Sequence, residues 1–92
     1  MITAAQAKEK TQERITQIAK EFITNEVSKA VDEAVRGGYF FATVSFEGVV
    51  NPIKTGPEVV KLLEQDGYTA EHLYSKDSAR ILDNYITIEW ED

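Results

Sequence analysis

The chain has 92 residues, of which 42% are hydrophobic and 28% charged, and its formal net charge is −6. These proportions suit one small folded domain rather than a disordered segment, and the absence of cysteine excludes disulfides and thiolate nucleophiles. The first residues lack the features of a signal peptide, and no stretch is apolar over the thickness of a bilayer. We therefore expect a soluble cytoplasmic protein with no membrane segment.

The charge is distributed unevenly along the chain. Residues 1–36 carry six basic and six acidic side chains, whereas residues 37–92 carry four basic and ten acidic ones. Proteins bind nucleic acid through clustered Lys and Arg that displace counterions from the phosphates. The acidic second part therefore argues against nucleic acid as a partner.

The first predicted element is a single long helix from Thr3 to Arg36, which contains no proline or glycine and is ended by Gly37 and Gly38. Thr3 and Gln6 have the spacing of a capping box at its start. Such a helix would be roughly 50 Å long, whereas a globule of this chain length is only about 25 Å across. The helix must therefore project, bend or pack against a partner.

The apolar positions of this helix change character near its middle. From Ile23 onward the large apolar residues lie on a face rotated by roughly a quarter turn from that of the first half. We expect this second half to pack on the protein's own sheet. The first half has a thinner apolar seam suited to another helix, which predicts a homo-oligomer, with a dimer favoured. The predicted interface residues are Ala4, Ala7, Thr11, Ile15, Ile18 and Phe22.

Residues 39–46 alternate in the manner of a strand, with Phe40, Ala42, Val44 and Phe46 on one face and Tyr39, Phe41, Thr43 and Ser45 on the other. A second helix is predicted from about Pro57 to Asp66, after the capping-box spacing of Thr55 and Glu58. Residues 68–74 suggest a second strand, although part of this segment could form a helical turn. Residues 84–90 alternate again, with Ile86, Ile88 and Trp90 on one face; residues 75–83 are polar and rich in turn formers.

These elements predict an α+β fold in which a long N-terminal helix (1–38) is followed by a small βαββ unit (39–92). The unit packs on the second half of the helix and contains a three-stranded, mostly antiparallel sheet. A right-handed crossover makes the first two strands parallel to each other. The third strand is then central and antiparallel to both, and Trp90 belongs to its buried face.

No residue cluster specifies a reaction. His72 is the only histidine and has no Cys, Ser or Asp at a catalytic spacing, so we predict a structural or surface role for it. The acidic residues lack the calcium-loop spacing and are interpreted as a solvated surface, with mimicry of nucleic-acid charge as the alternative. The glycines form no phosphate-binding loop. We therefore predict a non-enzymatic protein with no catalytic residues, no cofactor and no metal site.

Three aromatic residues on the second face of the predicted sheet, Tyr39, Phe41 and Tyr85, have two possible roles. If both helices cover the other face, these side chains are exposed and form a partner or ligand surface together with Glu89. If the helices sandwich the sheet, the aromatic residues belong to the core. Packing inside the chain is slightly favoured.

The sequence resembles a loose group of small bacteriophage and prophage proteins. The similar elements are the opening Thr3-Ala4-Ala5-x-Ala7, Gly38-x-Phe40, Leu62-Leu63-x-x-x-Gly67-Tyr68 and the terminal Ile86-Thr87-Ile88-x-Trp90. The resemblance implies an accessory protein of a mobile element that acts on host defence or host machinery, and it supplies no catalytic residues.

Two functional hypotheses remain open. In the first, the protein self-associates through its N-terminal helix and binds a host or phage protein. In the second, an oligomer encloses a small nucleotide-like molecule between the aromatic residues and basic groups such as Arg14, Arg36 or Arg80.

Overall fold

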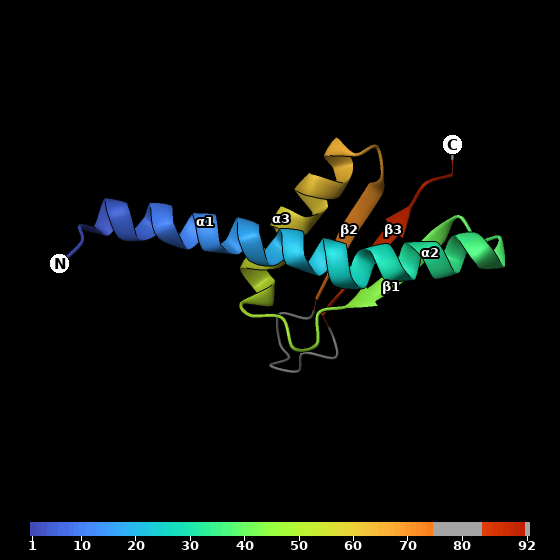
Figure 1. The fold of residues 1–92 in the computed structure, drawn as a ribbon, viewed down its shortest axis with the longest axis horizontal. Coiled ribbons are helices and arrows are strands. Elements are labelled where there is room, and N and C mark those ends of the chain that lie inside the picture. Colours follow the sequence, from blue (N-terminus) through green and yellow to red (C-terminus); the bar gives the residue numbers. More distant parts are fainter. Residues whose placement is uncertain (75–83, 92) are drawn as a thin grey trace.

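The computed structural model describes residues 1–74 and 84–91, and its helices and strands follow one another as predicted (Figure 1). The long helix comprises α1 (Ala4–Phe22), a π-helical segment η1 (Ile23–Val27) and α2 (Ser28–Gly37). The remaining elements are β1 (Phe41–Ser45), α3 (Pro52–Gln65), β2 (Thr69–Leu73) and β3 (Tyr85–Glu89). The α+β class is confirmed. The turn-rich segment 75–83 lies outside the described residues.

The predicted capping box at the start of the long helix is present. The Thr3 hydroxyl accepts the Gln6 backbone N–H at 3.1 Å, and the Thr3 N–H donates to Gln6 Oε1 at 2.9 Å. Gly38 ends the helix with a φ of 80°, which glycine adopts without a Cβ clash. Both predicted ends of the helix are therefore close to the observed ones.

The π-helical segment in the middle of the helix was not predicted, and it explains the change of apolar face there. Phe22 and Val27 are both buried although they are separated by five positions rather than the usual three or four. The Ser28 N–H bonds to the Ile23 carbonyl, which is the longer ring of a π-helix. The extra residue rotates the following turns, so that α1 and α2 can both direct apolar side chains at the same domain.

The sheet has the strand order β1-β3-β2, and β3 is antiparallel to both neighbours. Phe41 lies opposite Glu89 and Ser45 opposite Tyr85. The predicted central position of the third strand is therefore confirmed, and β1 and β2 form the two edges.

Both α3 and the long helix pack on the same face of this sheet (Figure 1). The core is made by the inward side chains of the strands together with apolar residues of the helices: Ala19, Phe22, Val27, Val44, Phe46, Val59, Leu63, Ile86 and Ile88. No helix in the described part of the chain has an apolar stretch long enough to cross a bilayer. The opposite face of the sheet carries exposed and half-buried side chains.

The second helix begins earlier than predicted. Asn51 precedes it in the left-handed conformation, and Pro52 occupies the first turn, where a missing N–H costs nothing. Thr55 is buried inside the helix, and its hydroxyl donates to the Val50 carbonyl at 3.0 Å. The predicted capping box of Thr55 and Glu58 is therefore wrong, because the Asn51-Pro52 signal is the one that starts the helix.

Two predicted core positions lie at the margin of the sheet. Phe40 precedes β1 and is 54% exposed, because the chain is still turning away from Gly38 there. Trp90 follows β3 and is half-buried, with its ring edge-on to Tyr68 at 6.0 Å. At this end of the sheet, β1 is thus two residues shorter and β3 one residue shorter than the apolar alternation indicated.

Candidate functional site

The six helix positions predicted to bind a partner lie in different environments. Phe22 is 5% exposed, and its ring stacks on Phe46 with the ring centroids 4.7 Å apart. It belongs to the protein's own core and has no free surface to offer, so its assignment to an oligomer interface is wrong. The sequence analysis placed the start of the docked part of the helix at Ile23, whereas the helix already packs on its own domain before the π-helical segment.

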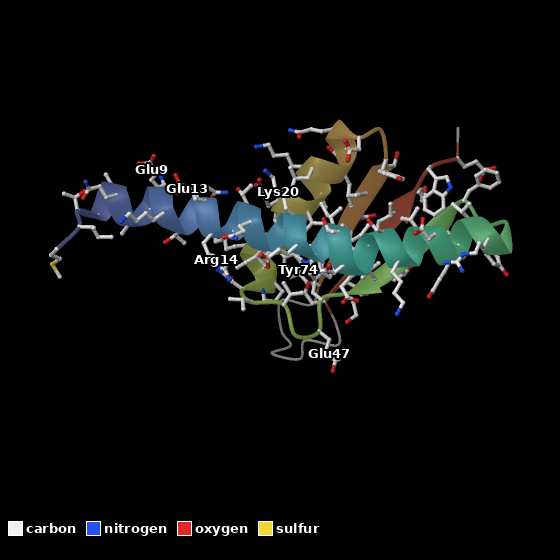
Figure 2. All side chains as sticks on the ribbon, in the orientation of Figure 1. Glu9, Glu13, Arg14, Lys20, Glu47 and Tyr74 are labelled. Carbon is white, nitrogen blue, oxygen red and sulfur yellow. The ribbon has the colours of Figure 1, made fainter. Side chains whose placement is uncertain are left out.

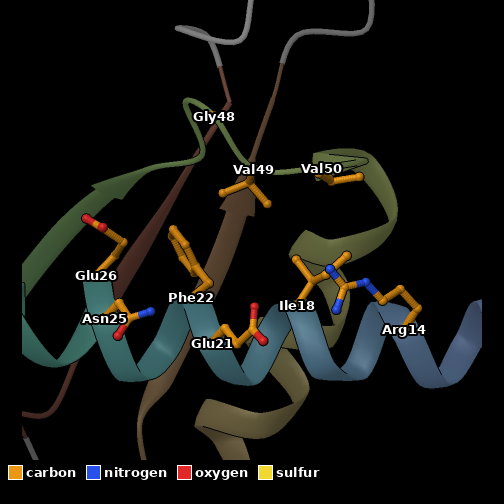
Figure 3. Close-up of a pocket in the computed structure, with 9 residues that line it drawn as sticks. All are labelled: Arg14, Ile18, Glu21, Phe22, Asn25, Glu26, Gly48, Val49 and Val50. Carbon is orange, nitrogen blue, oxygen red and sulfur yellow. The ribbon is translucent and has the colours of Figure 1, made fainter.

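Ile15 and Ile18 are half-buried by the protein's own domain. This part of α1 packs against α3, and the Thr16 hydroxyl hydrogen-bonds to Glu58 of α3 at 3.2 Å. Ile18 also borders the segment at Val49 (Figure 3). Part of each isoleucine remains accessible, but both contribute to the intrachain packing.

The remaining interface positions, Ala4, Ala7 and Thr11, lie on the part of α1 that projects from the domain (Figure 1). The molecule measures 52 × 29 × 21 Å, so the predicted projection of the helix is present. The Thr11 hydroxyl donates to the Ala7 carbonyl at 2.8 Å, which satisfies its polar group within the helix. Figure 2 shows Glu9 and Glu13 on the same projecting segment.

Three consecutive aromatic side chains are exposed where the chain leaves the long helix and enters β1. Tyr39, Phe40 and Phe41, here called the aromatic patch, are 59%, 54% and 57% exposed. The expectation that Tyr39 and Phe41 pack inside the chain is therefore wrong, because both helices cover the other face of the sheet. Val35, in the last turn of α2, is also 57% exposed.

The aromatic patch is held in place by the corner between α2 and β1. The Tyr39 N–H donates to the Ala34 carbonyl at 2.9 Å, and the Tyr39 ring lies so close to Gly37 that a Cβ there would meet it at 3.0 Å. Tyr39 and Phe41 contact each other edge to face at a centroid distance of 5.8 Å. These contacts restrict the Tyr39 and Phe41 rings before a partner binds, which lowers the entropic cost of binding.

The structure separates the other two residues of the predicted surface. Glu89 lies directly opposite Phe41 in the sheet, so these two share one end of the second face. Tyr85 is half-buried and lies opposite Ser45 at the other end, roughly 13 Å further along the strands. Tyr85 is therefore not part of the surface around Tyr39 and Phe41.

His72 is used in packing, as its predicted structural role requires. Its ring lies 5.0 Å from Phe46 and 4.9 Å from Tyr74, and its Nε2 hydrogen-bonds to Oδ1 of the buried Asn84. The backbone of α3 passes so close at Gly56 that any side chain there would clash with the imidazole. The alternation of β2, which places residue 72 on the same face as Ala70, is the signal that could have revealed this contact.

Residues 1–74 and 84–91 contain no group of three side chains placed to hold a metal ion. A hollow of about 230 Å³ beside α1 is bordered by Arg14, but also by Glu21 and Glu26 (Figure 3). Arg36 lies about 33 Å further along the helix, and Arg80 is outside the described residues. The described hollow therefore does not gather the cations that a nucleotide-like ligand needs.

Comparisons with protein-family models, with curated proteins and with solved structures found no match for this chain. Its function therefore has to be inferred from its own residues and their geometry.

Proposed function

We propose that this protein is a binding module that performs no chemical reaction and recognises a partner protein through the aromatic patch. The observation that supports this is the exposure of three consecutive aromatic side chains on a well-supported corner of the fold. Aromatic side chains dominate the energetics of protein interfaces, and exposed apolar clusters mark interaction sites. The phage resemblance makes a host or phage protein in the cytoplasm the partner that we propose.

The area of the aromatic patch limits the binding free energy that it can contribute. Burying the exposed halves of three aromatic side chains removes on the order of 300 Å² from water, which contributes about 7 kcal/mol. Association costs an estimated 4–15 kcal/mol of lost freedom, as an order of magnitude. The patch can therefore orient a partner, but useful affinity requires further contacts around it.

We also propose that the projecting part of α1 associates with a second copy of the chain. Ala4, Ala7 and Thr11 are small, which allows two helices to approach closely. The capping box satisfies backbone groups at the start of the helix, but an isolated solvated helix gains little stability from propensity alone. A partner helix in a dimer would supply the missing support.

The experiment that tests the binding function is affinity capture from the source cell with parent and altered protein as bait. Tyr39→Ser combined with Phe41→Ser should abolish recovery of a specific protein, whereas Lys61→Ser combined with Glu64→Ser on the exposed side of α3 should not. If the bait with Tyr39→Ser and Phe41→Ser recovers that protein as well as the parent bait does, the aromatic patch is not the contact surface.

A further inference from the structure

Within residues 1–74 and 84–91, no backbone hydrogen bond joins the outer edge of β1 to another segment. β1 is an edge strand whose only neighbour in the described sheet is β3. The Phe46 N–H donates to the Asn84 carbonyl and the Trp90 N–H donates to the Phe40 carbonyl, both at 3.0 Å. Because antiparallel pairing alternates, the even-numbered residues of this segment face β3. The N–H and C=O groups of Phe41, Thr43 and Ser45 consequently point away from the sheet.

A groove runs along this free edge, between β1 and the long helix. Its volume is about 390 Å³, and it is bordered on the helix side by η1 and α2. The strand side is formed by β1 and by Glu47, which lies shortly after the end of the strand (labelled in Figure 2). The bordering residues are Glu26, Lys29, Ala30, Glu33, Thr43, Val44, Ser45 and Glu47. The free edge is thus the floor of a groove with a helical wall.

The charge of the groove selects the kind of segment that fits it. Glu26, Glu33 and Glu47 carry three negative charges and Lys29 one positive charge, so the net charge is 1 − 3 = −2. All four side chains are exposed. Opposite charges on an incoming segment would be attracted, and like charges would be repelled.

We propose that β1 binds an extended, basic peptide segment of the partner as a fourth strand in this groove. The segment would pair its backbone with Phe41, Thr43 and Ser45 and would direct Lys or Arg side chains toward Glu26 and Glu33. Strand addition to a sheet edge is a recurrent mode of peptide recognition, in which the backbone provides affinity and the side chains provide selectivity. This inference rests on the proposed binding function and names the form of the partner.

The aromatic patch and the groove are connected through β1, because Phe41 of the patch is the first residue of the strand whose Thr43, Val44 and Ser45 border the groove. A segment that runs along β1 reaches the patch at the Phe41 end, where an apolar residue could contact Phe40 or Tyr39. This arrangement supplies the contacts that the patch lacks by itself. A second copy of the chain is disfavoured as the occupant, since two grooves that each carry −2 would face one another.

The test follows the backbone amides of β1 by NMR hydrogen exchange, with the synthetic peptide Lys-Val-Lys-Val-Lys-Val-Lys as the probe. On binding, exchange of the Phe41, Thr43 and Ser45 amides should slow by about tenfold or more, as expected for newly formed hydrogen bonds. The Ala42 and Val44 amides, which already face β3, should change little. The same peptide with Glu in place of Lys should bind at least about tenfold more weakly.

Two matched changes separate backbone pairing from charge. A probe N-methylated at the valines should lose the protection of the β1 amides, although its charge is unchanged. Glu26→Lys combined with Glu33→Lys should weaken binding of the parent probe by about tenfold. Glu9→Lys combined with Glu13→Lys, on the projecting part of α1, makes the same charge change outside the groove and should have no effect.

Three results would overturn the strand-addition proposal. The probe could bind without protecting the outward amides of β1, or the N-methylated probe could bind as well as the parent one. Alternatively, the amides could become protected without probe as the protein concentration rises, which would make a second copy the occupant. Each of these leaves the capture experiment with Tyr39→Ser and Phe41→Ser unaffected, so failure of this inference is distinguishable from failure of the binding function.

Discussion

Phe22 and Phe41 are the same residue type in two environments, one that stabilises the fold and one that is accessible to a partner. Phe22 is stacked in the core and Phe41 is 57% exposed. Phe22→Ala should lower the free energy of unfolding by about 3–5 kcal/mol, and Phe41→Ala by less than about 1 kcal/mol. Urea unfolding of the two variants provides the comparison. Similar losses for both would mean that Phe41 is buried in solution and that the aromatic patch is not exposed.

Gly56 and His72 form a close contact that a single methyl group should disturb. In most helices Gly→Ala is favourable by about 1 kcal/mol. Here the added Cβ would clash with the imidazole, and we expect Gly56→Ala to destabilise the fold by roughly 1–3 kcal/mol.

A double-mutant cycle isolates this contact, because His72→Ala removes the ring that Gly56→Ala would displace. In the His72→Ala background, the second change should become neutral or stabilising in thermal unfolding. An equal cost of Gly56→Ala in both backgrounds would assign the effect to the helix itself.

At the scale of the elements, the projecting turns of α1 are the part with least support from the domain. Ala7→Glu should dissociate the proposed dimer, because it introduces a charge into the seam, and sedimentation velocity measures the result. Ala5→Glu makes the same change about 160° around the helix from Ala7 and should leave the dimer intact. A parent protein that sediments as a monomer at micromolar concentration would contradict the self-association.

The end of β3 provides a second prediction at this scale. Ile88 is fully buried, whereas Trp90 is only half-buried at the margin of the sheet. Ile88→Ala should therefore cost about 3–4 kcal/mol and Trp90→Ala only about 2 kcal/mol. The opposite order in chemical denaturation would show that the Trp90 side of the sheet is more deeply packed than described.

For the whole molecule, the alternation of the strands and the glycine-terminated helix were sufficient to predict the α+β class and the central position of β3. The π-helical segment could not be predicted from the sequence. Its hydrogen bonds depend on the tertiary packing that buries both Phe22 and Val27. The start of α3 was missed because two proline-containing turn signals compete, and only Asn51-Pro52 begins the helix.

The candidate site was predicted only in part, because the sequence alternation does not give the register of the paired strands. Tyr39 and Phe41 were identified as a potential surface, but the alternation alone gave Tyr85 the same face without showing that it lies at the far end of the strands. The predicted strand order already made β1 one of the two edges. The groove beside it was not predicted, because it depends on how η1 and α2 lie against the strand.

The most direct test of the binding function is photo-crosslinking in the source cell with benzoylphenylalanine in place of Phe41. We predict a discrete crosslinked partner protein that disappears when Tyr39 and Phe40 are both changed to Ser. The same photo-reactive residue at Lys61, on the exposed side of α3, should not yield that partner. Identical crosslinked products from both positions, or none from Phe41, would contradict the assignment of the aromatic patch as the binding surface.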